Sequence, residues 1–523
     1  MNTPQNDPDS LEDVLDSLNE RVTWWAGLSD RAVAELLARV RADTWRVAPA
    51  WHRASCEAKG LDPESAEGAE ELLAGVVMFA RLAEVYERTL RHPRGEVRGS
   101  KVRVLPATWS ERLLFAGLSA QVWRDDSPTL VTHPGVAVVL GAGNVASLTP
   151  RDVLHHVVVE RRVVLVKANP VNDYLVEHWA GALRALVEVG VVAFTSGDAL
   201  YGQRLIRDSR VSAVHLTGSA RTAALITPEL RPGVEFTSEL GSVTPVIVVP
   251  GRWTRRQMRY QVDHVASMVV NNAGCNCVTP RVLVLSRDWP QRAQFQRLLE
   301  ARLLTLGSRP AFYPGARERQ GDFLKSRPDA TVIGLPTESE LPWVISWGHS
   351  STETNDAFTE EYFCPALVGV ELDETDPVAF LRAAQEFVTS RVWGTLAVTI
   401  LIDPATRRRP GVSEVLDDVV EALAYGVVAV NAFHALGIGL GSTTWGAAPG
   451  ADPSTGRGVV SNGLLVPGAR RSVVEGRFTT PWTPPWFITR PRGTTIAWRF
   501  LSWVTRHRLR DLLALTVLVL SPR

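Results

Sequence analysis

The alternation of strand-like and helix-like segments from residue 130 onward most constrains how this chain can fold. Apolar runs at 135–140, 163–166 and 191–195 are typical of strands, and the segments 153–159 and 174–189 carry hydrophobic residues at helical spacing. Consecutive parallel strands need crossover connections, which helices supply. The alternation therefore predicts an α/β fold with a doubly wound parallel sheet.

A second set of helices and strands follows residue 250. Helical spacing at 261–270 and 378–388 alternates with strand patterns at 282–285 and 394–401. A chain of 523 residues exceeds what one hydrophobic core supports. We therefore predict two doubly wound lobes with a cleft between them, and a boundary near the turn-forming proline and glycine at 250–251.

Two flanking segments complete the predicted organisation. Residues 1–129 carry helical spacing and predict a helical layer that packs on the first lobe. Residues 438–523 begin rich in glycine, serine and threonine and end in a basic, amphipathic stretch at 494–520. That stretch has two interpretations: it docks on its own protein, or it makes a peripheral membrane contact.

Charge and cysteine content argue against several classes of function. The 56 basic and 56 acidic side chains give a formal net charge of zero, so no overall field favours a nucleic acid. The N-terminus lacks a secretory pattern, and the apolar run 512–520 is about half the length needed to cross a bilayer. Four unevenly spaced cysteines are typical of a reducing compartment, so we predict a cytoplasmic protein.

Two of the four cysteines lie in a small-residue loop at 271–281. Cys275 and Cys277 are too close for an easy disulfide, and no second pair lies nearby to complete a zinc site, so no metal is predicted. A nucleophilic thiolate is the functional interpretation of this loop. The alternative is that both cysteines are small buried hydrophobes.

Four further stretches share the α/β context of the cysteine loop, each next to a predicted strand. They are Gly141-Ala142-Gly143-Asn144-Val145, Lys167, Thr217-Gly218-Ser219 and Glu239-Leu240-Gly241. Open parallel sheets bind ligands at the carboxyl ends of their strands. Together with the cysteine loop, these stretches predict a ligand site.

In this order, the residues resemble the landmarks of the aldehyde dehydrogenase superfamily. The landmarks are Asn144, Lys167, Thr217-Gly218-Ser219, Glu239-Leu240-Gly241, Asn272-x-Gly274-x-x-Cys277 and Glu361-Tyr362-Phe363-Cys364-Pro365. The resemblance implies that residues 130–250 form a dinucleotide-binding domain and 251–437 a catalytic domain. The chain departs from the pattern at Ser242 and Cys364, where the family has glycine, which predicts a divergent member.

The resemblance implies a catalytic role for three residues. Cys277 would attack an aldehyde carbon, giving a thiohemiacetal and then a thioester, and Cys275 ranks second as the nucleophile. The side-chain amide of Asn144 and the backbone N–H of Cys277 would stabilise the oxyanion. Glu239 would deprotonate the water that hydrolyses the thioester.

The resemblance also implies NAD or NADP as the cofactor. The predicted cofactor-binding residues are Lys167, Gly218, Ser219, Leu240 and Glu361. Two departures affect this site: Ala223 replaces the last glycine of the phosphate-facing turn, and Pro170 replaces the family's ribose-binding glutamate. Loss of that carboxylate removes a repulsion against a 2′-phosphate, so NADP is at least as plausible as NAD.

Three hypotheses for the function remain open from the sequence. The first is NAD(P)-dependent oxidation of an aldehyde to a carboxylic acid. The second is a coenzyme A-linked acyl-thioester reductase, although Glu239 favours hydrolysis by water. The third is a scaffold of the same fold whose cofactor turn has decayed, as Ala223 and Pro170 suggest.

Substrate and assembly are constrained only weakly. Trp393, Phe433 and Trp445, with few charges near them, allow an apolar or aromatic aldehyde. The resemblance implies a homodimer or homotetramer, because the family pairs its subunits through a strand extension and C-terminal segments. Residues 438–523 would supply this bridging strand and a basic, tryptophan-rich tail.

Overall fold

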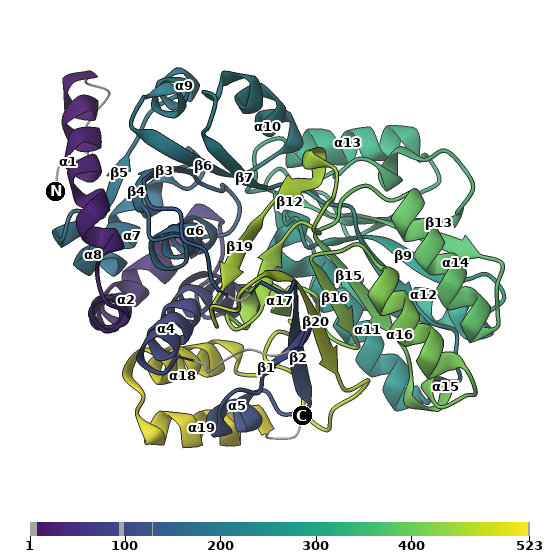
Figure 1. Cartoon of the computed structure of the whole chain (residues 1–523). Coiled ribbons are helices and arrows are strands. Elements are labelled where there is room, and N and C mark those ends of the chain that lie inside the picture. Colours follow the sequence, from purple (N-terminus) through teal and green to yellow (C-terminus); the bar gives the residue numbers. More distant parts are fainter. Residues whose placement is uncertain (1–7, 94–98, 128, 521–523) are drawn as a thin grey trace.

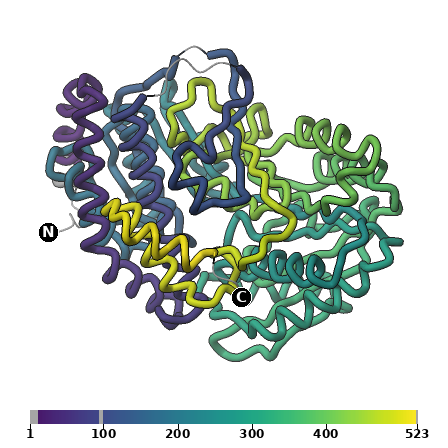
Figure 2. Tube along the Cα trace, turned by 90° about the horizontal axis from the view of Figure 1, so that it is seen from below, coloured from purple at the N-terminus to yellow at the C-terminus, as the bar shows by residue number. Residues whose placement is uncertain are grey.

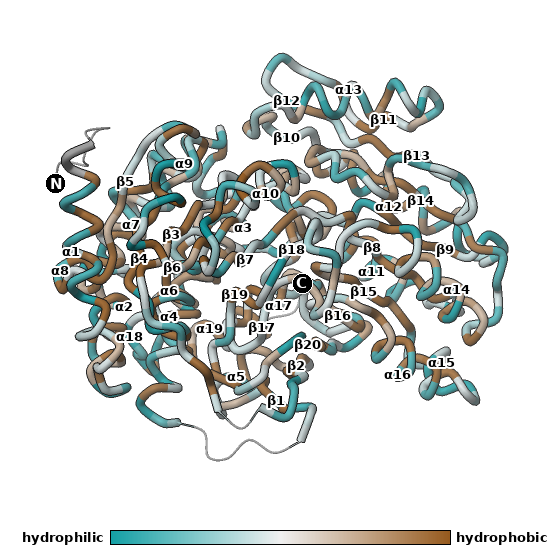
Figure 3. Tube along the Cα trace, turned by 45° about the horizontal axis from the view of Figure 1, so that its top comes forward, coloured by the Kyte–Doolittle hydropathy of each residue, from teal (hydrophilic) through white to brown (hydrophobic). Residues whose placement is uncertain are grey.

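The computed structural model describes residues 8–93, 99–127 and 129–520 (Figure 1). Two large sheets, of six and ten strands, organise the chain. Figure 3 shows hydrophobic residues along the strands of both sheets, and five neighbouring strands in the middle of the ten-stranded sheet are buried along their whole length. Strands covered on both faces are typical of parallel sheets flanked by helices.

The six-stranded sheet forms the first lobe. Its strands, in spatial order, are β18 (Gly456–Arg457), β7 (Glu235–Glu239), β6 (Val211–Thr217), β3 (Val136–Leu140), β4 (Val163–Lys167) and β5 (Val192–Thr195). The five strands β3 to β7 are parallel, and β18 pairs antiparallel with β7. The connecting helices are α6 (Leu148–Val158), α7 (Val176–Ala182), α8 (Arg184–Glu188), α9 (Ala199–Arg207) and α10 (Ala220–Ile226). The doubly wound fold predicted for this region is therefore confirmed.

The ten-stranded sheet forms the second lobe. Its strands, in spatial order, are β1 (Lys101–Leu105), β2 (Leu118–Arg124), β20 (Ala469–Gly476), β16 (Val427–Val430), β15 (Ala397–Leu401), β8 (Thr244–Val248), β9 (Pro280–Ser286), β14 (Ala366–Leu372), β13 (Trp343–Ser350) and β11 (Thr331–Ile333). The seven strands from β20 to β13 run parallel. The main helices of this lobe are α11 (Arg255–Val270), α12 (Arg292–Leu306), α13 (Ala316–Ser326), α14 (Pro377–Ser390), α15 (Pro404–Arg407), α16 (Val412–Ala422) and α17 (Leu436–Gly439).

The chain passes from one sheet to the other earlier than the turn at 250–251. Strand β8 pairs with β9 and β15 and so belongs to the ten-stranded sheet. The change of lobe therefore falls between Glu239, the last residue of β7, and Thr244, the first of β8. Our prediction placed β8 in the first lobe because its apolar pattern is the same in either sheet, whereas its strand partners are set by residues far along the chain.

The N-terminal segment covers the first lobe with helices, as predicted. Helices α1 (Pro8–Ala26), α2 (Asp30–Ala58), α3 (Ala66–Leu72) and α4 (Met78–Arg91) share one hydrophobic core with β3 and β4. The same segment also contains β1 and β2, an antiparallel pair that extends the ten-stranded sheet through β20. These strands were not predicted, because each is short and carries basic residues within its apolar pattern.

The C-terminal helices α18 (Gly493–Arg506) and α19 (Leu509–Leu520) pack against the N-terminal part of the chain. Figures 1 and 2 show α18 and α19 beside the N-terminal helices, far from α14 to α16 of the second lobe. The interpretation of 494–520 as a segment docked on its own protein is confirmed by these contacts. Within the described residues, no helix is both long and apolar enough to cross a membrane.

Candidate active site

The cysteine loop connects α11 to β9 through three consecutive residues with left-handed backbone. Asn272, Ala273 and Gly274 have φ values of 51°, 55° and 73°. Asparagine and glycine tolerate this region, whereas alanine is disfavoured there. A side chain at Gly274 would also lie 2.8 Å from the carbonyl oxygen of Cys364. This backbone explains why an asparagine and a glycine precede the cysteines at fixed spacing.

The two cysteines of the loop face different surroundings. Cys275 is 1% exposed, packs in the core of the second lobe, and its Sγ lies 3.5 Å from the carbonyl oxygen of Phe363. Cys277 is half-buried, and its Sγ lies 3.7 Å from Oε1 of Glu239. Of the two sulfurs, that of Cys277 borders a cavity and that of Cys275 does not. This difference is consistent with ranking Cys277 ahead of Cys275 as the candidate nucleophile.

Glu239 ends β7 and is 2% exposed. Burial raises its pKa to about 7, and the nearby Asp152 carboxylate acts in the same direction. The indole of Trp445 acts in the opposite direction. Burial, together with the carboxylate of Glu239, raises the pKa of the Cys277 thiol well above its ordinary value. A carboxylate with a pKa of about 7 can accept a proton near neutral pH, and Glu239 lies next to the Cys277 sulfur.

Asn144 follows β3 and is tied to the cysteine loop through its side chain. Its Nδ2 donates to the carbonyl oxygen of Cys275 at 3.1 Å, and the side chain of Asn272 donates to the backbone oxygen of Asn144 at 3.0 Å. The amide of Asn144 therefore lies beside the loop that carries Cys277. The structure brings together the three predicted catalytic residues, Asn144, Glu239 and Cys277.

A buried lysine that the sequence analysis missed holds this arrangement. Lys59, 3% exposed at the end of α2, donates to Oε2 of Glu71 at 2.6 Å, to Oδ1 of Asn272 at 2.8 Å and to the backbone oxygen of Asn144 at 3.0 Å. All three donors of its ammonium group are thus engaged. No local pattern marks Lys59, because two of its partners lie 85 and 213 residues away.

Cys277 lies where two cavities meet. The first has a volume of about 580 Å³ and is bordered by the glycine turns at 141–143 and 218–219; we call it the glycine-lined cavity. The second, of about 180 Å³, is lined mainly by hydrophobic side chains, and we call it the apolar cavity. Asn144, Glu239 and Cys277 line both cavities. A bound molecule in either cavity would reach the same sulfur.

All five predicted cofactor-binding residues border the glycine-lined cavity. They are Lys167, Gly218, Ser219, Leu240 and Glu361. The Ser219 hydroxyl caps α10 by accepting from the backbone N–H of Thr222 at 3.1 Å, and the Leu240 side chain is buried against Leu216 and Ala223. Ser219 and Leu240 therefore shape the turn as well as bordering the cavity.

The carboxylate of Glu361 lies against the turn that follows β7. Burial raises its pKa to about 7, while Arg281 and a hydrogen bond from the backbone of Ser242 act in the opposite direction. A β-carbon at Gly241 would collide with this carboxylate. The glycine after Glu239-Leu240 is therefore required by the close approach of Glu361.

The cavity also contains a carboxylate that the sequence analysis did not identify. Asp198 borders the glycine-lined cavity together with Lys167 and Pro170. Burial lowers the pKa of Lys167, and the charge of Asp198 partly offsets that shift. Although Pro170 supplies no carboxylate to this cavity, Asp198 at the start of α9 supplies one. The argument from Pro170 in favour of NADP is therefore weaker.

The aromatic residues suggested for the substrate side separate into two groups. Phe433 and Trp445 line the apolar cavity. Trp393 packs instead against the core of the second lobe. The sequence could not distinguish them, because all three follow or precede apolar strands of the same kind.

Comparisons with known proteins agree with this architecture. Residues 128–311 match the model of the aldehyde dehydrogenase family. Aldehyde dehydrogenase 21 from Physcomitrella patens, in complex with the reaction product succinate, superposes with a TM-score of 0.67 at 14% identity, over 90% of this chain and 91% of that chain. No curated protein matches in a sequence comparison.

Two further solved structures are similar at comparable levels. Glyceraldehyde-3-phosphate dehydrogenase from Methanocaldococcus jannaschii, complexed with NADP, has a TM-score of 0.62 at 12% identity, covering 91% of this chain and 96% of that one. A mutant of aldehyde dehydrogenase C from Pseudomonas syringae, complexed with NAD⁺ and octanal, has a TM-score of 0.62 at 14% identity, covering 90% of this chain and 89% of that one. The fold is thus that of aldehyde dehydrogenases.

Residues 128–311 thus resemble the aldehyde dehydrogenase family, and the chain as a whole has the fold of aldehyde dehydrogenases. This confirms the resemblance found in the sequence. The identities of 12 to 14%, like the departures at Ser242 and Cys364, show that the sequence has diverged far from these structures.

Proposed function

We propose that this protein oxidises an aldehyde to a carboxylic acid, with NAD or NADP as the second substrate. The observation that carries the proposal is the position of Cys277, which borders both cavities and lies 3.7 Å from a carboxylate. One cavity can then hold the aldehyde and the other the dinucleotide, with the sulfur between them. The match of residues 128–311 to the aldehyde dehydrogenase family model supports the same conclusion, as do similar structures complexed with NADP or NAD⁺.

The residues of the glycine-lined cavity fit a nicotinamide dinucleotide. Its volume of about 580 Å³ suits a cofactor-sized ligand, and its glycine turns lie at the carboxyl ends of parallel strands. Lys167 and Ser219 would contact the adenosine and phosphate portions, and Glu361 the ribose next to the nicotinamide. When bound, the dinucleotide supplies the hydride acceptor.

The chain's own residues would perform the remaining chemistry. Glu239 takes the proton of the Cys277 thiol, and the sulfur bonds to the aldehyde carbon. The side-chain amide of Asn144 and the backbone N–H of Cys277 stabilise the negative oxygen that results. After oxidation the carbon is a thioester on Cys277. Glu239 first releases the thiol proton to solvent and then removes a proton from water. The water oxygen bonds to the thioester carbon, and the carbon–sulfur bond breaks so that the sulfur leaves as the acid is released.

Coenzyme A is the alternative acceptor of the thioester. We favour water because Glu239, which the acylating relatives generally lack, lies beside Cys277. Absorbance of the reduced nicotinamide should grow with an aldehyde and NAD or NADP, without coenzyme A. Turnover that requires coenzyme A would favour the acyl-thioester reductase. Absence of dinucleotide binding by a folded protein would favour the scaffold hypothesis.

We also propose that the protein forms a homodimer or homotetramer in the cytoplasm. The resemblance to aldehyde dehydrogenases supports this assembly, and β1 lies at the edge of the ten-stranded sheet, where another strand can be added. Sedimentation equilibrium of the purified chain tests the assembly. A mass equal to one chain at micromolar concentration would contradict it.

A peripheral membrane contact through α19 is a separate proposal. Leu509, Leu513 and Val517 are exposed on this helix, close to Arg508 and Arg510 in the sequence. Apolar side chains flanked by arginines are typical of helices that lie on anionic bilayers. Flotation with vesicles containing anionic phospholipid tests the contact, and a protein that stays at the bottom of the gradient contradicts it.

A further inference from the structure

The C-terminal part of the chain contributes many of the side chains that line the apolar cavity. Its lining includes Trp486, Phe487 and Ile488 from the loop before α18, and Ile496, Phe500, Leu515 and Val519 from α18 and α19. We propose that residues 485–519 form the wall of an acyl-chain tunnel, which fits the protein to aldehydes with a long hydrocarbon chain. This inference rests on the proposed function and names its substrate class.

The loop before α18 is fixed to the helix that leads into the cysteine loop. The backbone N–H of Ile488 donates to the hydroxyl of Ser267 at 3.1 Å, and the ring of Phe487 stacks on His264 with centroids 5.1 Å apart. Both Ser267 and His264 belong to α11. The loop before α18 is therefore fixed relative to α11, the helix that leads into the loop carrying Cys277.

The two C-terminal helices present one side to the cavity and the other to solvent. Asp511, buried at the start of α19, accepts hydrogen bonds from Ser502 at 2.6 Å and Arg499 at 3.1 Å, which fastens α19 to α18. Leu515 and Val519 are 2% and 4% exposed and line the cavity, whereas Val517 of the same helix is 71% exposed. The helix pair thus forms a rigid apolar wall.

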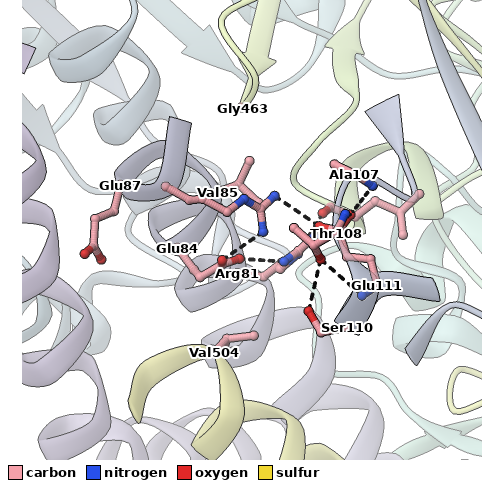
Figure 4. Close-up of polar contacts among 12 residues, drawn as sticks. Arg81, Glu84, Val85, Glu87, Ala107, Thr108, Ser110, Glu111, Gly463 and Val504 are labelled. Atoms are coloured by element: carbon pink, nitrogen blue, oxygen red, sulfur yellow. Dashed lines mark hydrogen bonds and ion pairs between the residues drawn. The ribbon is translucent and has the colours of Figure 1, made fainter. Parts of the chain in front are cut away.

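A buried ion-pair cluster lies behind residues that line the apolar cavity next to the C-terminal wall. Figure 4 shows Arg81 of α4 paired with Glu111 of α5 (Trp109–Leu114), and Arg81 also donates to the backbone oxygen of Leu440 at 3.0 Å. Phe115, directly after α5, meets Phe500 of α18 edge to face with ring centroids 5.9 Å apart. Leu440, Phe115 and Phe500 all line the apolar cavity. Arg81 therefore holds α5 and the backbone at Leu440 in place, and α5 in turn positions Phe115 against α18.

Charged side chains are few in the apolar cavity, and each of them already contacts another group of the protein. Of the described lining residues, three are charged: Glu70, Glu239 and Arg490. Glu239 lies beside Cys277, Glu70 accepts from the backbone N–H of Asn272, and Arg490 donates to the backbone oxygens of Thr483 and Leu518. An aldehyde with a carboxylate or phosphate at the far end of its chain would lose the hydration of that group among hydrophobic side chains, whereas a hydrocarbon chain gains by burial.

The test is a chain-length profile measured on the full-length protein. We expect kcat/KM to rise about threefold to fourfold for each added methylene from hexanal to dodecanal, as a buried methylene predicts. In Leu515→Trp, the dodecanal-to-hexanal ratio of kcat/KM should fall at least about tenfold. Val517→Trp, on the solvent side of the same helix, should keep the wild-type ratio.

A binding measurement separates this inference from the proposed function. Dodecanoate should bind the Cys277→Ala protein without a dinucleotide, detected by calorimetry, and Val519→Phe in that background should weaken its binding at least about tenfold. Aldehyde oxidation with a flat chain-length profile and no dodecanoate binding would overturn the tunnel and leave the function intact. If dodecanoate binds, Val519→Phe weakens its binding, and no aldehyde is oxidised, the tunnel stands and the proposed function is overturned.

If Leu515→Trp fails to fold, as circular dichroism would show, the wild-type profile and the wild-type affinity for hexanoate, octanoate and dodecanoate still decide the matter. Equal affinity for the three acids would overturn the proposal, and affinity that rises with length supports it.

Discussion

The two cavities that meet at Cys277 differ in what surrounds the sulfur. The glycine-lined cavity carries backbone turns and the charged side chains Lys167, Asp198 and Glu361. The apolar cavity is closed by hydrophobic side chains from three distant parts of the chain. A polar, multiply charged ligand fits the first, and a ligand that must lose its water fits the second.

In the proposed mechanism one sulfur serves two substrates, and this difference gives the two sides of the sulfur separate tasks. Burial raises the pKa of Glu239 to about 7 and that of the Cys277 thiol well above its ordinary value. The proposed mechanism therefore passes the thiol proton to Glu239, within the site. The glycine-lined side contributes binding groups instead. Substitutions on the two sides should accordingly affect different steps.

The largest effect on activity is expected from removing the sulfur of Cys277, which borders both cavities. Cys277→Ala should lower aldehyde oxidation about 10⁴-fold or more, because no other described side chain offers a nucleophile at both cavities. Dinucleotide affinity should stay within about threefold of wild type. Cys275→Ala is the matched control, since that sulfur packs in the core. Loss of turnover in Cys275→Ala with retention in Cys277→Ala would reverse our assignment of the nucleophile.

The next effect separates proton transfer from binding. Glu239→Gln should lower kcat/KM about 10²- to 10⁴-fold, the range for removal of a general base. In the wild-type protein the acceptor is the ionised carboxylate, so kcat/KM should rise with pH through about 7, the pKa to which burial raises Glu239. The variant should lack this limb between pH 6 and about 8. An unchanged pH profile in Glu239→Gln would exclude Glu239 as the base.

Much of this site could be predicted from the sequence because its chemistry is local. Asn144, Lys167 and Glu239 follow or end strands, and the backbone at 272–274 requires an asparagine and a glycine at fixed positions before Cys277. The alternation of strands and helices likewise indicated both lobes.

The remaining features depend on partners that are distant in sequence. Lys59 reaches Asn272 across 213 residues, and the apolar face of α19 meets α5 of the N-terminal segment only in three dimensions. A hydrophobic pattern shows that a helix has a buried face, but it does not show what the face covers. Strand β8 illustrates the same limit, because its pattern fits either sheet.

A smaller effect should follow from removing the support of the cysteine loop. Lys59→Met leaves the buried carboxylate of Glu71 unpaired, which costs about 3 to 5 kcal/mol in the free energy of unfolding. Displacement of Asn144 and Asn272 should lower kcat/KM about ten- to a hundredfold. Urea unfolding and initial rates on the folded fraction measure the two effects.

Lys101→Met is the matched control for that substitution. The ion pair of Lys101 with Glu421 is exposed, so its loss should change the free energy of unfolding by less than about 1 kcal/mol and leave kcat/KM unchanged. Equal effects of the two lysine substitutions would contradict the role of Lys59 in supporting the loop.

The smallest effect concerns the cofactor side and the choice between NAD and NADP. Asp198 borders the glycine-lined cavity with Lys167, and its negative charge opposes a 2′-phosphate there. Asp198 also caps α9 by accepting from the backbone N–H of Tyr201 at 2.9 Å. Asp198→Asn keeps a capping oxygen while removing the charge, so the affinity for NADP relative to NAD should rise about threefold to tenfold.

Titration of both dinucleotides into wild type and Asp198→Asn measures this ratio, and the salt concentration provides an internal check. Because Asp198 is exposed, the difference between the two proteins should shrink as the ionic strength increases. A ratio that does not change on substitution would mean that the 2′ position of the ribose lies away from Asp198. The carboxylate missing at Pro170 would then have no replacement in this cavity, and the argument for NADP from that position would regain its force.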